Sequence, residues 1–259
     1  MQNKRMRPCQ KIYPSEHSPD APAAPDGLSL PDASGDFSHR VIRVDPHRPE
    51  PSSLRKAAQV IREGGLVIFP TDTLYGLGCS AFHEPCLDRI FSLKERPSAK
   101  PLPVLVSGPG QLAELIRGPV SALAHDIIQE FWPGALTLIF QAADRVLARI
   151  TGGTKTIGVR MPGCQLTLDL INLARVPLAA TSVNISGRPV HQEMRSMIAE
   201  WAPKVELILD AGAVQGNLAS TVLDLTTHPP RLLREGAISA RRLHRYLGPD
   251  PEPDQKQTG

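Results

Sequence analysis

Short apolar segments alternate with longer amphipathic segments from about residue 41 to residue 246. A strand buries its apolar face and a helix its apolar stripe, so the two kinds of segment must pack against each other. The pattern predicts one α/β domain with a mixed sheet and flanking helices. The expected strands are 41–44, 66–69, 102–106, 136–140, 156–160, 178–180, 207–209, 221–225 and 231–233, and the expected helices are 52–63, 85–94, 120–131, 166–175, 192–201 and 239–246.

The two ends of the chain differ from this pattern. Residues 1 to about 40 are dominated by Pro, Ser, Asp and Ala, and such a segment cannot bury enough apolar surface to offset its ordering entropy. We therefore expect a disordered tail over 1–40, a domain over 41–248 and a short C-terminal tail over 249–259. A tethering or RNA-contacting arm is the alternative for the first tail, whose charges nearly cancel.

Composition excludes several classes of protein. No apolar run approaches the length of a membrane span, and no hydrophobic signal core follows the basic start of the chain. The four cysteines include no Cys-x-x-Cys pair, so no zinc site is predicted. A net charge of +3 permits a phosphate-rich partner without requiring one. A cytoplasmic protein with no membrane contact is expected.

Three cations crowd the junction between an expected helix and an expected strand. Lys94, Arg96 and Lys100 lie there together with Pro97 and Pro101, which stiffen the backbone because each ring fixes φ. A stiff loop carrying three cations indicates a site for a multiply charged anion such as phosphate. A solvated basic loop is the alternative.

A second candidate segment runs from Pro70 to Cys79, directly after the expected strand 66–69. Thr71, Thr73 and Tyr75 supply hydrogen-bonding groups, and glycines allow close approach of a ligand to the backbone. Open α/β sheets bind ligands at such strand ends, although buried turns have a similar composition.

Together with three later motifs, these segments resemble the YrdC-type L-threonylcarbamoyladenylate synthases in their short, single-domain form. The resemblance covers about residues 54–247 and implies a twisted sheet around an open, basic, concave cavity. The motifs, in order, are Pro-Thr-Asp-Thr-Leu-Tyr-Gly-Leu at 70–77, Lys-x-Arg-x-x-x-Lys-Pro at 94–101, Gly-Val-Arg-Met-Pro at 158–162, Ser-Val-Asn at 182–184 and Ser-Thr-Val-Leu-Asp-Leu at 220–225.

The resemblance implies a reaction of L-threonine, bicarbonate and ATP that yields threonylcarbamoyl-AMP and pyrophosphate. The product serves the N6-threonylcarbamoyladenosine modification of tRNA through a transferase complex, and contact with tRNA or double-stranded RNA is a further implied partnership. Magnesium would arrive with the nucleotide, because no carboxylate cage for a metal is visible in the sequence.

The resemblance also assigns site residues. It implies that Lys94 and Arg96 are catalytic and that six residues bind ATP, namely Lys94, Arg96, Lys100, Thr156, Asn184 and Arg234. It implies a threonine site formed by Thr73, Arg160, Ser182 and Ser220. Each has a structural alternative: a salt bridge for Arg160, a turn for Ser182 and Asn184, and a surface ion pair for Arg234. Leu105 and Gln192 depart from residues that some relatives carry at those positions.

Three other functions compete with synthesis. The same basic cavity could belong to a non-catalytic module that binds double-stranded RNA or tRNA. The chain could also be a weakly active paralogue of the same fold, or resemble the carbamoyl-transfer domain of hydrogenase-maturation proteins. An amino-acid pocket built from Thr73, Arg160, Ser182 and Ser220 favours the synthase, because RNA backbone binding does not need one.

Overall fold

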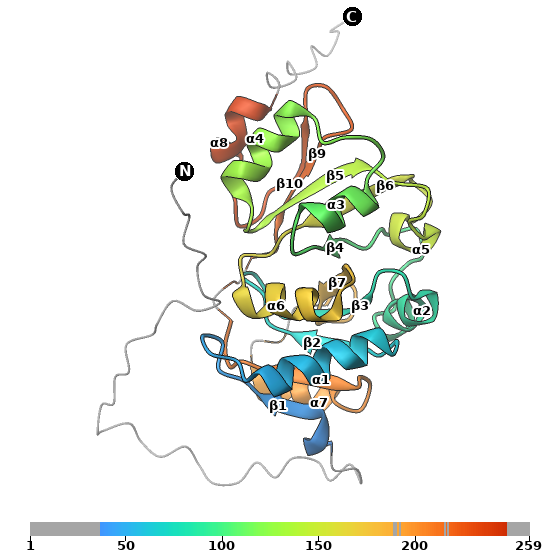
Figure 1. The fold of residues 1–259 in the computed structure, drawn as a ribbon, viewed down its shortest axis with the longest axis vertical. Helices are drawn as coiled ribbons and strands as arrows, with labels where there is room; N and C mark the ends of the chain where they lie inside the picture. The colour runs from blue at the N-terminus through green and yellow to red at the C-terminus, as the bar shows by residue number, and fades with distance from the viewer. Residues whose placement is uncertain (1–36, 189–190, 192, 215, 217, 248–259) are drawn as a thin grey trace, which may run out of the picture.

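The computed structural model describes residues 37–188, 191, 193–214, 216 and 218–247 (Figure 1). Of the tail expected over 1–40, residues 1–36 lie outside the described residues. The expected C-terminal tail over 249–259 also lies outside them. Residues 38–40, assigned to the N-terminal tail, form a short 3-10 helix, Ser38–Arg40. The guanidinium of Arg40 donates to the carbonyl of Val205 at 3.0 Å, so the domain begins slightly earlier than the composition indicates.

A mixed sheet organises the described part of the chain. Its strand order is β1-β8-β2-β3-β7-β4-β6-β5-β9-β10, with both parallel and antiparallel neighbours, which confirms the predicted fold class. The strands are β1 (Val41–Arg43), β2 (Val67–Phe69), β3 (Gly76–Ser80), β4 (Val104–Leu105), β5 (Leu136–Gln141), β6 (Thr156–Arg160), β7 (Leu178–Ser182), β8 (Leu207–Asp210), β9 (Thr221–Asp224) and β10 (Arg231–Arg234).

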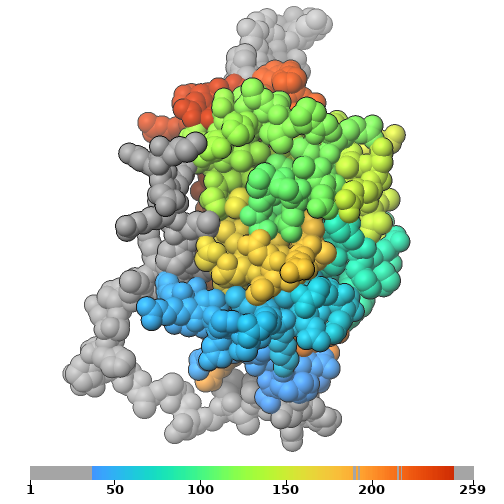
Figure 2. Space-filling view, viewed as in Figure 1, coloured from blue at the N-terminus to red at the C-terminus, as the bar shows by residue number. Residues whose placement is uncertain are grey.

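Helices cover the sheet, and alternate strand residues feed two apolar cores. In β2, Ile68 packs into one core while Val67 and Phe69 pack into the other, as expected for a strand buried on both faces. Helices α1 and α6 lie side by side over the second core (Figure 1), and their atoms adjoin on the face shown in Figure 2. The helices are α1 (Pro51–Arg62), α2 (Glu84–Leu93), α3 (Pro109–Leu115), α4 (Ala122–Phe131), α5 (Ala148–Thr151), α6 (Gln165–Ala174), α7 (Met194–Trp201) and α8 (Ala240–Leu243). None of the described helices has the length and apolar character needed to cross a bilayer.

The structure departs from the predicted elements at several points. The sequence pattern did not predict β3, α3 or α5. The N-cap position of α1 is held by Glu50 instead of a serine; its side chain makes no capping hydrogen bond, and a proline follows in the first turn. Helix α8 is a single turn followed by a 3-10 turn. The start predicted for the helix at 192–201 lies outside the described residues.

Candidate functional site

The loop from Pro70 to Leu74 connects β2 to β3, and the hydroxyl of Thr71 organises it. Thr71 Oγ1 donates to the carbonyl of Leu74 at 2.6 Å and accepts from the backbone N–H of Thr73 at 3.1 Å. Such a turn closed by a threonine hydroxyl satisfies backbone groups that a short loop would otherwise leave unpaired. Thr167 of α6 hydrogen-bonds to the carbonyl of Pro70, which fixes the start of the loop.

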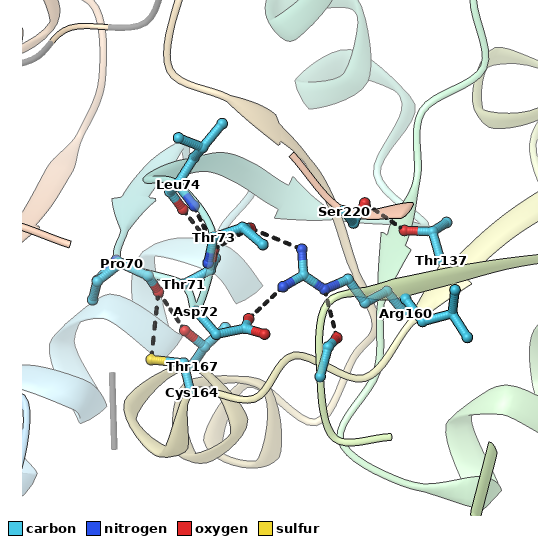
Figure 3. A network of polar contacts seen from close by, with 12 residues as sticks. Pro70, Thr71, Asp72, Thr73, Leu74, Thr137, Arg160, Cys164, Thr167 and Ser220 are labelled. Carbon is cyan, nitrogen blue, oxygen red and sulfur yellow. Dashed lines mark hydrogen bonds and ion pairs between the residues drawn. The ribbon is translucent and has the colours of Figure 1, made fainter. Parts of the chain in front are cut away.

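Arg160, the last residue of β6, reaches this loop (Figure 3). Its guanidinium forms an ion pair with Asp72, donates to Thr73 Oγ1 at 2.9 Å and donates to the carbonyl of Gly134 at 2.9 Å. Only 6% of Arg160 is exposed. The structure therefore contains the salt bridge that sequence analysis gave as the alternative, and the same guanidinium contacts a second predicted site residue.

Charge at this position is not fully balanced. Burial lowers the pKa of Arg160 below its ordinary value; the ion pair with Asp72 opposes that shift, and the like charge of Arg234 adds to it. An arginine remains protonated at neutral pH despite such a shift. The guanidinium groups of Arg160 and Arg234 thus act on each other, while the carboxylate of Asp72 is paired with Arg160. This arrangement favours a bound anion.

Ser220 comes directly before β9 and faces Thr137 of β5 (Figure 3). Its hydroxyl is 2.9 Å from Thr137 Oγ1 of β5, and either hydroxyl can be the donor. Arg234 at the end of β10 donates to the carbonyl of Ser220 at 2.8 Å. The surface ion pair proposed as an alternative for Arg234 is not what holds it, because its described bonds go to Ser220.

A second cluster joins the end of α2 to the end of β7. The buried ammonium of Lys94 donates to the carbonyl of Ser182 at 2.5 Å, to the carbonyl of Asn184 and to Asn184 Oδ1 at 3.1 Å. Ser182 Oγ also donates to Asn184 Oδ1 at 2.6 Å. The strand ends at Ser182, so the turn alternative describes this segment, and the turn brings the two side chains into contact.

Every N–H of the Lys94 ammonium therefore has a protein acceptor. A contact between Lys94 and phosphate would require one of these bonds to be exchanged. Burial, with the charge of Arg96 adding to it, lowers the pKa of Lys94 to about 8. In this arrangement Lys94 positions the loop that carries Ser182 and Asn184.

The hydrogen bonds that end helix α2 fix the backbone position of Arg96. The N–H of Arg96 bonds to the carbonyl of Phe91 at 2.9 Å and the N–H of Glu95 to that of Ser92 at 3.2 Å, which is a Schellman motif. Glu95 takes the left-handed conformation with φ 50°, a position usually held by glycine. The guanidinium of Arg96 then folds over the loop and donates to the carbonyl of Pro101 at 2.7 Å.

Two predicted residues lie apart from these clusters. The side chain of Lys100 is exposed, and Thr156 at the start of β6 bonds to the hydroxyl of Thr154 at 2.9 Å. No hydrogen bond or ion pair between either side chain and another predicted site residue occurs within the described ranges. The structure thus brings together Thr73 with Arg160, Ser220 with Arg234, and Lys94 with Ser182 and Asn184.

Four residues beside the site were not among the assigned site residues, although Thr71 was named as a hydrogen-bonding group of its segment. Thr71 and Asp72 belong to the motif at 70–77 and lie next to Thr73 in the sequence. This position could have indicated that they are part of the site. Nothing in the sequence indicated a role for Thr137, because it is a single polar residue within an otherwise apolar predicted strand. Ser186 has a buried hydroxyl oxygen without a hydrogen-bond partner in the described structure, which is unusual for a native protein.

The side chains near the site can be tested for a resident metal. Among the described residues, no group of three or more His, Cys, Asp or Glu side chains could hold a metal ion. Asp72, the carboxylate at the site, is engaged by Arg160. Within the described ranges, the side chains therefore do not form a protein cage for a resident metal.

Fold and site together define an α/β protein with buried hydroxyls next to an excess of positive charge. The family model Sua5/YciO/YrdC, described as "Telomere recombination", matches residues 59–236. The chain belongs to this family.

Relatives named threonylcarbamoyl-AMP synthase are similar to the chain. The protein from Pyrococcus abyssi is 40% identical over 78% of this chain and 59% of its own length, and that from Bacillus subtilis is 36% identical over 76% and 57%. The chain thus spans less than two thirds of these two relatives. The mouse protein is 32% identical over 85% of this chain and 78% of its own length.

Two solved structures show the same fold. Pyrococcus abyssi Sua5 complexed with L-threonine superposes with a TM-score of 0.76 at 40% identity, covering 80% of this chain and 61% of that one. Escherichia coli YciO superposes with a TM-score of 0.70 at 25% identity, covering 80% of this chain and 98% of the other.

Proposed function

We propose that this protein is a threonylcarbamoyl-AMP synthase that uses L-threonine, bicarbonate and ATP. The observation that carries the proposal is the buried guanidinium of Arg160 beside the hydroxyl of Thr73, in a region where positive charge exceeds negative. This pairing suits a small ligand with both a carboxylate and a polar donor. The names of the relatives, and the structure of Pyrococcus abyssi Sua5 in complex with L-threonine, support L-threonine as the substrate.

The proposed chemistry has two steps. The amine nitrogen of threonine attacks the carbon of bicarbonate, a C–N bond forms and water leaves, which gives a carbamate. A carbamate oxygen then attacks the α-phosphorus of ATP, and the bond to the bridging oxygen of the leaving pyrophosphate breaks. All reactants of the second step are anionic, so positioning and electrostatic stabilisation by cations account for most of the catalysis.

Residue roles in this proposal are divided between the two substrates and draw on residues from more than one cluster. Arg160 holds the threonine carboxylate, with Thr73, Ser182 and Ser220 around the rest of that substrate. Arg96 and Lys100 neutralise the phosphates, since neither cation is bound to a carboxylate in the described structure. Lys94 acts on the nucleotide by holding the turn of Asn184 in place, while Thr156 and Arg234 complete the nucleotide site. Magnesium, where it takes part, accompanies the ATP phosphates.

The proposal further includes transfer of the product to a complex that modifies tRNA, and a cytoplasmic location for the reaction. Direct contact with tRNA or double-stranded RNA is part of this proposal and rests on the excess of cations around the site. RNA binding without synthesis is the competing function.

One experiment tests the reaction. The purified full chain is incubated with L-threonine, ¹³C-bicarbonate, ATP and magnesium, and the products are analysed by mass spectrometry. Threonylcarbamoyl-AMP carrying one ¹³C atom, with an equal amount of pyrophosphate, is the expected result. An AMP–threonine adduct without the labelled carbon, or no adduct at all, would overturn the proposal, and binding of double-stranded RNA by such a protein would favour the competing function.

A further inference from the structure

Thr137 is a buried polar residue in an otherwise apolar stretch of β5. It stands between Leu136 and Leu138, and only 4% of it is exposed. A hydroxyl buried in this way costs free energy unless it is hydrogen-bonded. Valine has nearly the same shape and no polar group to satisfy, so packing alone does not account for the hydroxyl of Thr137.

Most of the other buried threonines use their hydroxyls to hold the backbone. Four of them hydrogen-bond to a backbone carbonyl, namely Thr71, Thr151, Thr167 and Thr221. Thr137 Oγ1 makes no such bond in the described structure, and its partner is the hydroxyl of Ser220, 2.9 Å away. Thr137 thus resembles Thr73, whose hydroxyl bonds to the side chains of Thr71 and Arg160. Both hydroxyls serve side chains of the proposed site.

The side chain of Thr137 is held between two neighbouring strands. Strand β5 pairs with β6 on one side and with β9 on the other. A Cβ added at Gly158 of β6 would lie 3.2 Å from Cγ2 of Thr137, so the methyl group points toward β6. The hydroxyl points the other way, toward Ser220 (Figure 3). Contact of the methyl group with Gly158 therefore favours the rotamer that aims the hydroxyl at Ser220.

Thr137 shares a face of the sheet with Arg160. Ile139 of β5 is paired with Gly158 of β6, and side chains two positions apart in a strand emerge on the same face. Thr137 and Arg160, each two positions from this pair, therefore emerge on one face. Arg234 donates to the carbonyl of Ser220 at 2.8 Å. The two hydroxyls thus lie in surroundings to which both guanidinium groups contribute.

One proton of the hydroxyl pair has no acceptor within the described residues. Each hydroxyl carries one proton, and the bond between Thr137 and Ser220 uses one of the two, whichever group donates. The guanidinium of Arg234, 3.4 Å from Ser220 Oγ, can only donate and so takes up neither proton. The pair keeps one O–H donor, which in cationic surroundings suits an anionic or polar oxygen.

We propose that Thr137 is a positioning residue that donates its proton to Ser220, and so leaves the hydroxyl proton of Ser220 for an oxygen of the amino-acid substrate. This inference deepens the proposed function and rests on it. The proposed threonine site already includes Ser220, and Thr137 adds the group that orients it. Without the hydroxyl of Thr137, Ser220 can rotate and meets the substrate less often in the productive direction.

Two substitutions distinguish positioning from packing, because the two roles predict opposite orders. Thr137→Val keeps the shape and removes the hydroxyl, so affinity for L-threonine should fall about fivefold, the effect of one lost neutral hydrogen bond. Affinity for ATP should change less than twofold. Thr137→Ser keeps the hydroxyl and loses the methyl group, so both affinities should stay within twofold of the original. Calorimetry measures them. Weaker threonine binding in Thr137→Ser than in Thr137→Val would assign Thr137 to packing and overturn the inference.

A second pair of variants and a control keep the test decisive. Should Thr137→Val not fold by circular dichroism, Thr137→Ala is compared with Thr137→Ser, since both lack the methyl group and they differ in the hydroxyl. Thr151→Val is the matched control, because Thr151 is also buried and its hydroxyl donates to the carbonyl of Ala148. It should leave both affinities within twofold. An equal loss of threonine affinity in Thr151→Val and Thr137→Val would overturn the inference.

A double-mutant cycle tests whether Thr137 acts through Ser220. In a protein that carries Ser220→Ala, adding Thr137→Val should change threonine affinity less than twofold, because the hydroxyl that it orients is already gone. A further fivefold loss in the double variant would show that Thr137 acts independently of Ser220, and would overturn the inference.

Failure of this inference is distinguishable from failure of the proposed function. A protein that makes no threonylcarbamoyl-AMP, but whose L-threonine affinity falls in Thr137→Val and recovers in Thr137→Ser, refutes the synthase and keeps the role of Thr137. A protein that makes the product with equal threonine affinity in the original and in Thr137→Val keeps the synthase and refutes that role. No binding of L-threonine at all refutes both.

Discussion

The ammonium nitrogen of Lys94 lies 3.1 Å from Oδ1 of Asn184, although 90 positions separate the two residues in the chain. A lysine whose charge sequence analysis assigned to phosphate thus bonds to the turn that carries two further site residues. Substitution of Lys94 should therefore affect mainly the stability of the protein, and substitution of Arg96 mainly its binding of ATP.

We expect Lys94→Met to lower the free energy of unfolding by about 1–3 kcal/mol, because it leaves buried oxygen acceptors without a donor. Arg96→Ala should leave stability within about 0.5 kcal/mol, as is usual away from the core, and weaken ATP binding. Urea unfolding and ATP calorimetry measure the two effects. Equal stability of the two variants, with ATP binding lost in both, would assign Lys94 to the phosphates directly.

The lowered pKa of Lys94 predicts a dependence of stability on pH. The folded value of about 8 lies below the ordinary value of 10.5, so between these values the unfolded chain binds more protons than the folded one. The free energy of unfolding should then rise with pH across this window, by at most about 1.4 kcal/mol per pH unit from this residue. Below about pH 8, Lys94 is charged in both states, and the unfavourable burial of its charge lowers the free energy of unfolding by its full amount.

Urea unfolding of the original protein and of Lys94→Met between pH 7 and 11 isolates this contribution. The difference between the two proteins should change with pH mainly above pH 8. Parallel curves would contradict the prediction. If the variant does not fold, the ¹³C shift of the Lys94 ε-carbon gives the midpoint directly.

Arg160→Ala should weaken L-threonine binding by a factor of about thirty or more, because losing a desolvated charged contact costs about 2–5 kcal/mol. ATP binding should change much less. Arg117→Ala is a matched control, since Arg117 also pairs with an aspartate, Asp144, but both side chains are exposed. That pair should be worth no more than about 1 kcal/mol. If Arg160→Ala unfolds the protein while Arg117→Ala does not, the guanidinium is mainly a structural partner of Asp72.

Local patterns predicted much of the fold. Most strands were predicted because β-branched and apolar residues cluster in them, and β6 with Arg160 at its end matched the prediction residue for residue. The order of the strands in the sheet was not predictable, because register depends on packing between distant segments.

Direct contacts in the site depend on the same long-range packing. Lys94 and Ser182 are 88 positions apart, and Thr137 and Ser220 are 83 positions apart. Residue types within a motif indicate chemistry, as they did for Thr73 and Arg160. They do not show which carbonyl or hydroxyl from another strand each side chain meets, so the acceptors of Lys94 and the partner of Ser220 came only from the structure.

Strand β3 was not predicted because it contains two glycines, which are rare in strands. These glycines allow close packing against Phe69. A Cβ added at Gly78 would lie 2.9 Å from the side chain of Phe69 and 2.9 Å from the carbonyl oxygen of Ala179. The buried ring of Phe69 occupies the space that a side chain on β3 would need. This close approach holds β3 next to the loop that carries Thr73.

We therefore expect Gly78→Ala to lower the free energy of unfolding by about 1–3 kcal/mol, the usual cost of overpacking a buried site. Gly110 in α3 is the matched control, because a Cβ added there has no neighbour within 4 Å. Gly110→Ala should be neutral or stabilise the protein by up to about 1 kcal/mol, since alanine is the better helix former. Urea unfolding of both variants decides. An equally stable Gly78→Ala would mean that β3 shifts easily, and threonine affinity would then report whether Thr73 moves with it.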